Sequence, residues 1–271
     1  LMVDGRCVSK ITQGITTEIM GEAWTPAPVL GRHDGGVSTH VMGDRIADWV
    51  DASREWYRFA HWLEAFETAG VSPNVGSYLG GGTLRKVAMG MDGNPADDAA
   101  RKLMRRTMAE AMEDGAFGVS YALIYAPDCY ADVDEIVDVC EIVGEFDGSY
   151  ITHLRSEAGA IFSALDEAFE IGLRAAVPVE IYHLKSSGRA NWDKMPRVIE
   201  HIEAARADGL DVTADMYPYA ASGTGLASVL PPWAMAEGKL YENLQDPTAR
   251  ARIRAAATKP DGTWAAMVDQ H

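Results

Sequence analysis

The sequence predicts a parallel α/β fold of the (β/α)8 barrel (TIM barrel) type. Six runs typical of buried strands alternate with amphipathic helical patterns at a spacing of roughly thirty residues, which indicates βα units around a parallel sheet. Polar and charged residues end several successive strands, as they do in barrels. The alternative is an open doubly wound sheet, but no G-x-G-x-x-G motif follows the first strand, which disfavours a nucleotide-binding sheet.

The strand candidates are short apolar runs that end at glycine or polar residues. They span residues 14–21, 71–79, 116–123, 149–152, 179–182 and 210–217. Because a complete barrel has eight strands, we expect residues 1–271 to form a single partial barrel.

Helical patterns fill the intervals between these strands. Residues 44–68 carry helix-like runs rich in tryptophan and phenylalanine. Asn94 is the expected N-cap of the next helix, with Pro95 at its first position and Gly115 at its end. Further apolar stripes at helical spacing lie within 136–143, 161–169 and 198–205. From residue 246 onward we expect a helix and an irregular end.

The composition excludes several classes of partner. The chain has 271 residues, 47% of them hydrophobic, and a formal net charge of −16. Because no basic patch stands out, nucleic acid and anionic membrane surfaces are poor candidate partners. The sequence shows no signal peptide and no run of about eighteen apolar residues that would span a membrane. The three cysteines are an odd number and form no C-x-x-C motif, so they do not indicate a set of disulfides, and we expect a reducing, cytoplasmic setting. The sequence does not indicate an oligomeric state.

Two similar strings stand thirty residues apart, HLRS at 153–156 and HLKS at 183–186. Each closes a strand candidate, so a βαβ arrangement would bring His153 and His183 to the same edge of the sheet, where such folds build active sites. Neutral imidazole is the commonest protein ligand for zinc-like metals. The pattern therefore predicts a metal site, with two core histidines bonded to backbone as the alternative.

A metal site of this kind needs a third metal ligand, and an enzyme built around it needs residues that bind the substrate. Glu22 follows directly on the first strand and is our candidate ligand, although a solvated loop glutamate would fit the same position. Strand alternation sends Arg155 and Lys185 to the side of the histidines, where we expect them to bind an anion. Glu157 is the expected partner of Arg155, which would leave Lys185 free for a substrate carboxylate.

Phenol groups and one further carboxylate lie near the same edge. Tyr125 lies in a loop after a strand, and Tyr217 follows the last strand candidate. Both hydroxyls are candidates to bind a substrate carboxylate, although tyrosines of this kind more often only pack. Asp215 ends the same strand and would bind metal, orient a ligand, or cap the loop.

Several strings taken together resemble one enzyme family. They are GITTEIMGE at 14–22, TLR at 83–85, GVSYALIYAP at 118–127, ITHLRSE at 151–157, YHLK at 182–185 and DMYPY at 215–219. In this order the strings resemble those of the N-acyl-D-amino-acid deacylases (D-aminoacylases) of the amidohydrolase superfamily. The resemblance extends over residues from about 5 to about 254. The resemblance implies a zinc-dependent barrel, with one or two ions, that hydrolyses the amide of N-acyl-D-amino acids to a carboxylate and a D-amino acid.

The resemblance also implies roles for single residues. His153 and His183 resemble the zinc ligands on strands five and six. The sequence has GEAW at 21–24 where those enzymes have Gly-Asn-Cys-Gly, so Glu22, or a neighbour, is expected to replace the cysteine ligand. Lys185 and the tyrosines at 125 and 217 resemble the groups that hold the substrate's α-carboxylate.

The departures from the family pattern concern both chain ends. The family's His-x-His would lie before Leu1 and its general-base aspartate beyond His271, and the flanking small β-domain is absent. Glycines at 80–82 also stand where the family has a histidine. We therefore interpret the visible strands as about strands two to seven of a longer protein. No catalytic residue is expected within these 271 residues, which by themselves should show little or no activity.

Two other functions remain open from the sequence. One is a cyclic amidase of the dihydroorotase or hydantoinase kind, against which Lys185 and the tyrosines argue by favouring an open-chain carboxylate. The other is a non-catalytic, truncated barrel whose unpaired sheet edges invite association.

Overall fold

The strands that the computed structural model describes all pair in parallel, and they follow one another in chain order. The structure describes residues 1–33, 37, 46–219 and 221–258. A two-stranded sheet pairs β1 (Thr17–Met20) with β2 (Asn74–Ser77). A five-stranded sheet has the order β3 (Leu79–Gly80), β4 (Gly118–Ala122), β5 (Ser149–His153), β6 (Val179–Ile181), β7 (Val212–Ala214).

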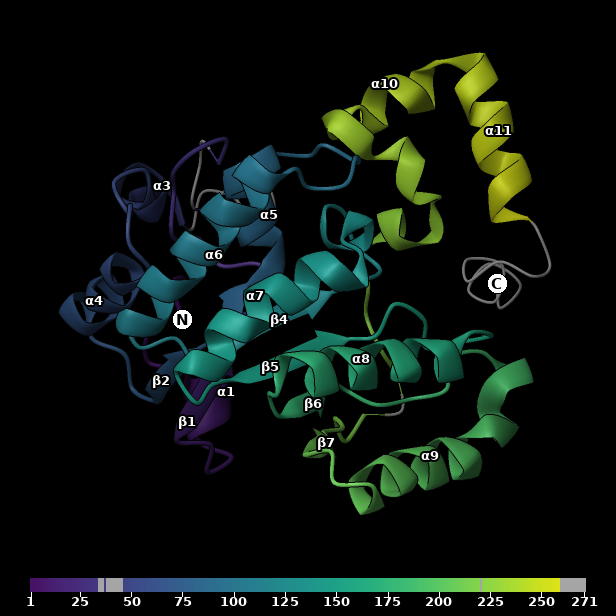
Figure 1. Ribbon diagram of the computed structural model, residues 1–271. Coiled ribbons are helices and arrows are strands. Elements are labelled where there is room, and N and C mark those ends of the chain that lie inside the picture. The colour runs from purple at the N-terminus through teal and green to yellow at the C-terminus, as the bar shows by residue number, and fades with distance from the viewer. Residues whose placement is uncertain (34–36, 38–45, 220, 259–271) are drawn as a thin grey trace.

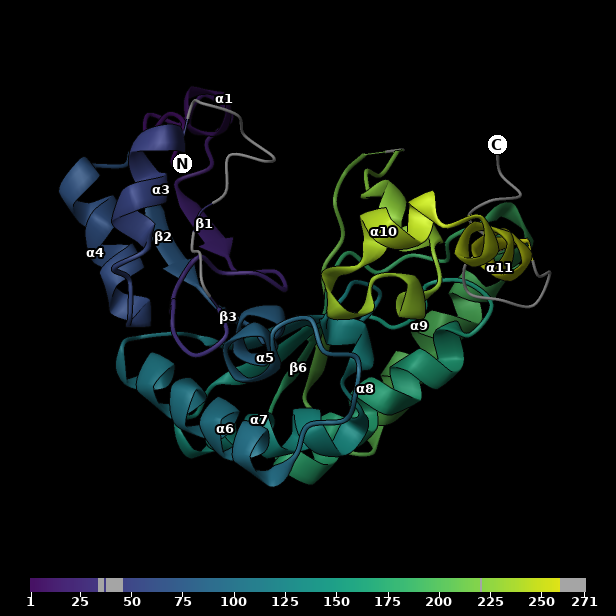
Figure 2. The same cartoon turned by 90° about the horizontal axis from the view of Figure 1, so that it is seen from above.

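The two sheets form one curved succession of strands. β2 leads into β3 through Tyr78, and the Phe117 N–H donates to the Ser77 carbonyl over 3.0 Å, which joins β2 to the approach to β4. Nowhere among the described strands does the order reverse, as a doubly wound sheet would require. The predicted barrel-type sheet is therefore the observed one. Figure 2 shows the strands on the inside of an open arc.

Helices cover the outer side of this arc (Figures 1 and 2). The helices that connect or flank the strands are α1 (Val8–Ile11), α3 (Ala47–Ser53), α4 (Phe59–Ala69), α5 (Gly81–Met89), α6 (Asp98–Glu113), α7 (Val133–Glu145), α8 (Ile161–Ala175) and α9 (Met195–Ala207). After β7 the chain forms α10 (Leu240–Gln245) and α11 (Pro247–Ala257), so the helix expected after residue 246 is observed. Its expected irregular end falls mostly outside the described residues. None of the described helices has the length and apolar character needed to span a bilayer.

One sequence-based helix prediction needs correction. Asn94 is not an N-cap: its backbone and side-chain N–H groups donate to the Asp92 carboxylate, which holds it in a turn. Asp97 caps α6 instead, since its Oδ1 accepts the Ala100 N–H over 2.8 Å. Residues 44 and 45 lie outside the described residues, and the helical runs expected over 44–68 are observed as α3 and α4. Between them Arg58 is extended and binds Asp114 over 2.7 Å.

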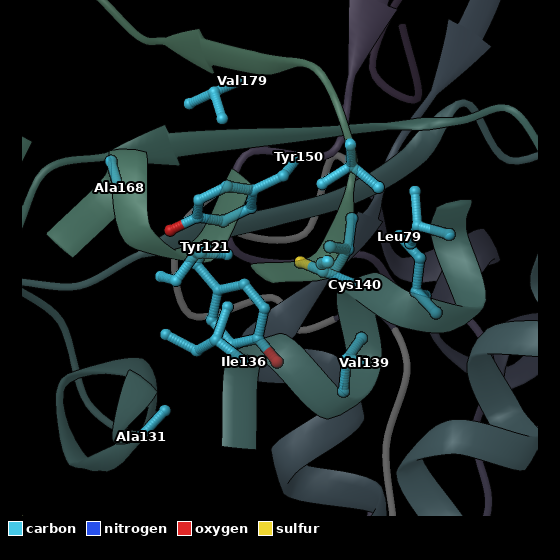
Figure 3. Close-up of a cluster of buried hydrophobic side chains, with 14 of the residues drawn as sticks. Leu79, Tyr121, Ala131, Ile136, Val139, Cys140, Tyr150, Ala168 and Val179 are labelled. Carbon is cyan, nitrogen blue, oxygen red and sulfur yellow. The ribbon is translucent and has the colours of Figure 1, made fainter. Parts of the chain in front are cut away.

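The hydrophobic core lies between the outer face of the five-stranded sheet and these helices. Tyr121 on β4 and Tyr150 on β5 are fully buried and meet edge to face, with ring centroids 6.3 Å apart. Figure 3 shows the two rings with Ile136 and Cys140 of α7 in the same cluster. Burial of such large side chains fixes β4 and β5 against α7, and so fixes the level at which both strands end.

A buried ion pair ties the outer helices to one another. Arg85 of α5 donates to the Glu135 carboxylate of α7 at 2.5 and 2.6 Å, and the two side chains are 0% and 1% exposed. Arg85 also donates to the backbone carbonyl of Asn94 over 2.6 Å. Removing one partner would leave the other charge buried without compensation, which is far more costly than losing a surface pair.

We therefore predict that Arg85→Met lowers the free energy of unfolding by about 3–5 kcal/mol, as measured by urea denaturation. The matched control is Arg106→Met, which removes the exposed i,i+4 pair with Glu110 at 3.8 Å and should cost less than about 1 kcal/mol. Equal losses in the two variants would contradict this interpretation of the buried pair.

Candidate metal centre

The register of β5 and β6 brings the two predicted histidines together. His153 is the last residue of β5 and pairs with Ala122 of β4, while Thr152 pairs with Ile181 at the end of β6. His183 follows two residues after Ile181, so it lies at the same carboxyl edge. The two imidazole rings are nearly perpendicular, at 82°, with centroids 4.5 Å apart.

His183 owes its position to the neighbouring strand. Its φ is 37°, a left-handed conformation that is uncommon for a residue with a side chain. Asp215, just after β7, holds it there: the Asp215 carboxylate accepts the His183 N–H over 2.5 Å, and its carbonyl accepts the Leu184 N–H over 2.9 Å. Of the roles that the sequence left open for Asp215, this contact supports orientation of a site residue.

Glu22 reaches the same place from β1. Gly21, with φ 103°, turns the chain at the end of this strand, and the Ala23 N–H then donates to the Ser120 hydroxyl of β4 over 3.2 Å. This turn puts Glu22 Oε1 at 3.3 Å from His183 Nε2 and 3.5 Å from His153 Nδ1. One ligand atom from each of the three residues lies within 4.8 Å of the other two.

The charges of the carboxylates and imidazoles in this group strongly influence the pKa values of Glu22 and His183. The imidazoles of His153 and then His183 lower the pKa of the Glu22 carboxyl to about 2. Burial opposes the charged form of His183, but the carboxylates of Glu157 and Glu22 outweigh it and raise its pKa to about 9. At physiological pH the Glu22 carboxylate is therefore charged and His183 is protonated. A metal ion would have to displace that proton, because a ligating imidazole is neutral.

The donor set and its spacing fit a zinc-like ion. A tetrahedral ion with bonds of about 2.0–2.1 Å separates its ligand atoms by roughly 3.3–3.4 Å, close to the distances from Glu22 Oε1 to the two ring nitrogens. Both ring nitrogens of His153 are buried, and neither has a hydrogen-bond partner among the described residues. Buried polar atoms are normally satisfied, so these two unpaired nitrogens fit a site that a metal completes.

Lys185 and Glu157 form an ion pair beside the two histidines. Lys185 Nζ donates to Glu157 Oε1 over 2.5 Å and to the His183 carbonyl over 2.9 Å. The expectation that Glu157 pairs with Arg155 and leaves Lys185 without a partner is therefore wrong. Glu157 is also 3.1 Å from His183 Nδ1 and 3.8 Å from His153 Nε2. Its place beside both histidines was not apparent from the sequence, where it is separated from the second string by a whole helix.

Arg155 does not lie with the other predicted anion-binding residues. β5 ends at His153, so strand alternation does not extend to Arg155. Its guanidinium binds the Glu167 carboxylate of α8 at 2.8 Å and the carbonyls of Cys129 and Ala131 at 2.9 and 2.8 Å. Arg155 therefore joins the loop after β4 to α8, and we no longer assign it to substrate.

A cavity of about 280 Å³ opens over the histidines. Its walls include Lys185 and both predicted tyrosines: the Tyr125 ring centroid is 5.6 Å from that of His153, and the Tyr217 centroid is 6.2 Å from that of His183. The Tyr125 hydroxyl is 2.5 Å from the hydroxyl of Thr224 in the loop after β7. Sequence reasoning missed that loop, whose ASGTG composition at 221–225 was the available signal.

Comparisons with known proteins identify relatives of this chain. No family model matches it. It is 35% identical over 219 residues to a D-aminoacylase and 34% identical over 230 residues to an N-acyl-D-aspartate deacylase, both from Alcaligenes xylosoxydans xylosoxydans. The matches cover 80% and 83% of this chain but 43% and 44% of the relatives, so the chain spans less than half of their length.

Solved structures lead to the same group of proteins. Two structures of D-aminoacylase match with a TM-score of 0.71, at 33% and 32% identity, and cover 81% of this chain and 45% of the solved chain. One is described as defining a novel subset of amidohydrolases, and the other concerns a binuclear metal centre. The resemblance inferred from the motifs is thus confirmed as homology, and the fold as part of an amidohydrolase barrel. The individual site roles, and the general base expected beyond His271, stay predictions.

The turn at Gly21 offers a test of how Glu22 is positioned. A Cβ at this residue would lie 2.1 Å from the Tyr78 carbonyl oxygen, and the backbone has φ 103°. We predict that Gly21→Ala displaces the turn, lowers the free energy of unfolding by about 1–3 kcal/mol and weakens zinc binding at least about tenfold.

The matched control for this variant is Gly14→Ala. Gly14 also has positive φ, 82°, but nothing lies within 4 Å of its Cβ position. Denaturation and zinc titration of both variants separate backbone strain from the close contact at Gly21. If Gly14→Ala weakened zinc binding as much as Gly21→Ala, the turn at Gly21 would not be what positions Glu22.

Proposed function

We propose that this homologue of the D-aminoacylases carries the metal-binding part of an enzyme that hydrolyses the amide bond of N-acyl-D-amino acids. One observation supports the proposal most: His153, His183 and Glu22 converge at the mouth of a cavity that Lys185 also lines. An amide-bond hydrolase of this kind needs a metal beside a group that binds a carboxylate. The names of the relatives, D-aminoacylase and N-acyl-D-aspartate deacylase, support the same substrate class.

The proposed ligands are His153 through Nδ1, His183 through Nε2, and Glu22 through its carboxylate. These are the atoms that face one another at 3.3 and 3.5 Å. We infer one or two zinc ions, since imidazole and carboxylate ligands suit zinc and one solved D-aminoacylase is described as binuclear. When bound, zinc would polarise the amide carbonyl and lower the pKa of a bound water toward about 7.

The chain's own side chains would bind and orient the substrate. An ammonium group has three donors, and Lys185 Nζ contacts Glu157 Oε1, the His183 carbonyl and His183 Nδ1. To hold the substrate α-carboxylate together with the hydroxyls of Tyr125 and Tyr217, Lys185 would exchange one of these contacts for the substrate. Holding the carboxylate at one wall and the amide at the metal fixes two of the groups on the α-carbon, so the space left for the side chain would decide which configuration reacts.

Other parts of the proposal concern partner and location. The net charge of −16 makes nucleic acid a poor partner, and the proposed partner is a small-molecule substrate. All three cysteines are free, which supports a reducing, cytoplasmic setting.

The direct test is hydrolysis by the complete protein that contains this chain, loaded with zinc. We expect release of the D-amino acid from N-acetyl-D-methionine and at least about tenfold slower turnover of the L enantiomer. Preferred turnover of a hydantoin or dihydroorotate would instead favour a cyclic amidase, and the proposal would be wrong.

Zinc binding by the 271-residue chain tests the metal centre separately. We predict that His153→Ala weakens zinc binding by at least about a hundredfold in a chelator competition, because it removes a ligand from a small set. His201→Ala is the control, since His201 pairs with Asp166 on the outer helices, 2.7 Å away and far from the cavity lining. Unchanged zinc content in His153→Ala would remove the basis of the proposed site.

A further inference from the structure

Trp24 is a large apolar side chain that lines the cavity over the two histidines. It is 39% exposed, while its neighbour Ala23 is 2% exposed. The proposed metal ligands and carboxylate-binding residues make up one part of the cavity lining. Trp24, Ala122 and Ile124 make up an apolar part that neither of these groups uses. An accessible apolar wall beside a reaction centre is suited to bind an apolar part of a substrate.

The backbone on both sides of Trp24 is fixed to the start of α5. The Ala23 carbonyl accepts the Gly82 N–H over 3.0 Å, and the Thr25 N–H donates to the Thr83 hydroxyl over 2.9 Å. A Cβ at Gly82 would lie 2.9 Å from the Ala23 carbonyl oxygen and 3.4 Å from Trp24 Cε2, so a larger residue there would crowd this turn. Because its backbone is held in this way, the indole needs little ordering when a ligand binds.

The indole also has a charged neighbour on α5. Lys86 Nζ lies 4.4 Å from the centre of the Trp24 ring, a distance at which an ammonium group is attracted to the face of an indole. Lys86 does not belong to the described residues that line the cavity. It therefore contacts the indole from outside the cavity, and the part of the ring that lines the cavity stays open to an apolar group.

The position of Trp24 relative to Lys185 determines which part of a substrate it would meet. Trp24 packs beside α5, which follows β3, whereas Lys185 lies beside Tyr217, after β7, with Nζ 5.6 Å from the ring centre. In the strand order, His153 at the end of β5 lies between these two places. The amide of a substrate is planar and trans, so its acyl group points away from its α-carbon. With the α-carboxylate at Lys185 and the carbonyl at the metal, the acyl group is directed toward Trp24.

We propose that Trp24 determines which acyl group the enzyme accepts, an inference that rests on the proposed function. Its indole, together with Ala122 and Ile124, binds the acyl group of the N-acyl-D-amino acid and favours apolar acyl groups longer than acetyl. An acidic acyl group is disfavoured, because Lys185 is the one lysine or arginine among the described residues of the cavity lining, and it is already paired with Glu157. A second substrate carboxylate would lose its hydration at the apolar wall without gaining a charge partner.

The test compares the kcat/KM values of the complete zinc-loaded protein for N-acetyl-, N-butyryl- and N-succinyl-D-methionine. Burial of each added CH2 group is worth about fourfold, so we expect the butyryl substrate to exceed the acetyl substrate by about tenfold or more. The succinyl group has the length of the butyryl group but ends in a carboxylate, and it should react about tenfold or more slowly than the butyryl group. A kcat/KM for the butyryl substrate equal to or below that for the acetyl substrate would overturn the inference.

Variants of Trp24 assign the preference to this residue. Trp24→Ala should bring the ratio of kcat/KM for the butyryl and acetyl substrates to within about twofold of 1, and Trp24→Phe, which keeps an apolar ring, should retain a preference for butyryl. Trp192→Ala is the matched control, since Trp192 is 61% exposed and lies beside Arg189 at 5.7 Å but does not line the cavity. It should leave the ratio unchanged. Because a ratio does not depend on the amount of active enzyme, partial unfolding of a variant cannot imitate the expected result.

The outcomes also distinguish this inference from the function on which it rests. If the zinc-loaded protein hydrolysed none of the three substrates, the proposed function would fail, and the inference with it. If it hydrolysed all three at similar rates, or preferred the succinyl substrate, only the role of Trp24 would be refuted. A preference for butyryl that persisted unchanged in Trp24→Ala would show that other residues bind the acyl group, and the inference would again be wrong.

Discussion

The parallel pairing of β5 with β6 is the constraint on which the site depends. Parallel strands end at a common edge, so residues that follow neighbouring strands lie close together. Tyr150 of β5 and Val179 and Ile181 of β6 are buried in one hydrophobic core, which stabilises the pairing. The pairing brings the two imidazole rings together at the edge, with centroids 4.5 Å apart.

The site itself is built from polar contacts that span distant parts of the chain. Asp215, after β7, holds the backbone of His183 in a left-handed conformation, and Gly21, after β1, provides the turn that aims Glu22. Strained backbone persists only where its surroundings hold it, and it often marks functional positions. Here it helps residues that follow β1, β5 and β6 direct their side chains to one point, although β1 is far from β5 and β6 in the sequence.

The sequence was sufficient for features governed by local pattern. Strand runs bounded by turns, and histidines repeated at their ends, predicted the sheet and the pair of rings. It was insufficient where choice of partner decided the outcome. Arg155 and Lys185 occupy equivalent places in their strings, yet Arg155 binds Glu167 of α8 and Lys185 binds Glu157. Such choices depend on which loop turns where, and period-two alternation stops being informative once β5 ends at His153.

The capping error has a similar origin. Asn94 followed by Pro95 has the composition of a helix start, but the Asp92 carboxylate captures both N–H groups of Asn94. Local hydrogen bonds of this kind compete with helix capping. Asp97, three residues later, then caps α6 in its place.

The central claim is that two imidazoles and the Glu22 carboxylate share one ion at this edge. The most direct measurement is a crystal structure of the zinc-loaded chain, with the ion located by anomalous scattering. We predict an ion at about 2.0–2.2 Å from His153 Nδ1, His183 Nε2 and a Glu22 oxygen. An ion bound elsewhere, or bound through only one of the two histidines, would contradict the claim.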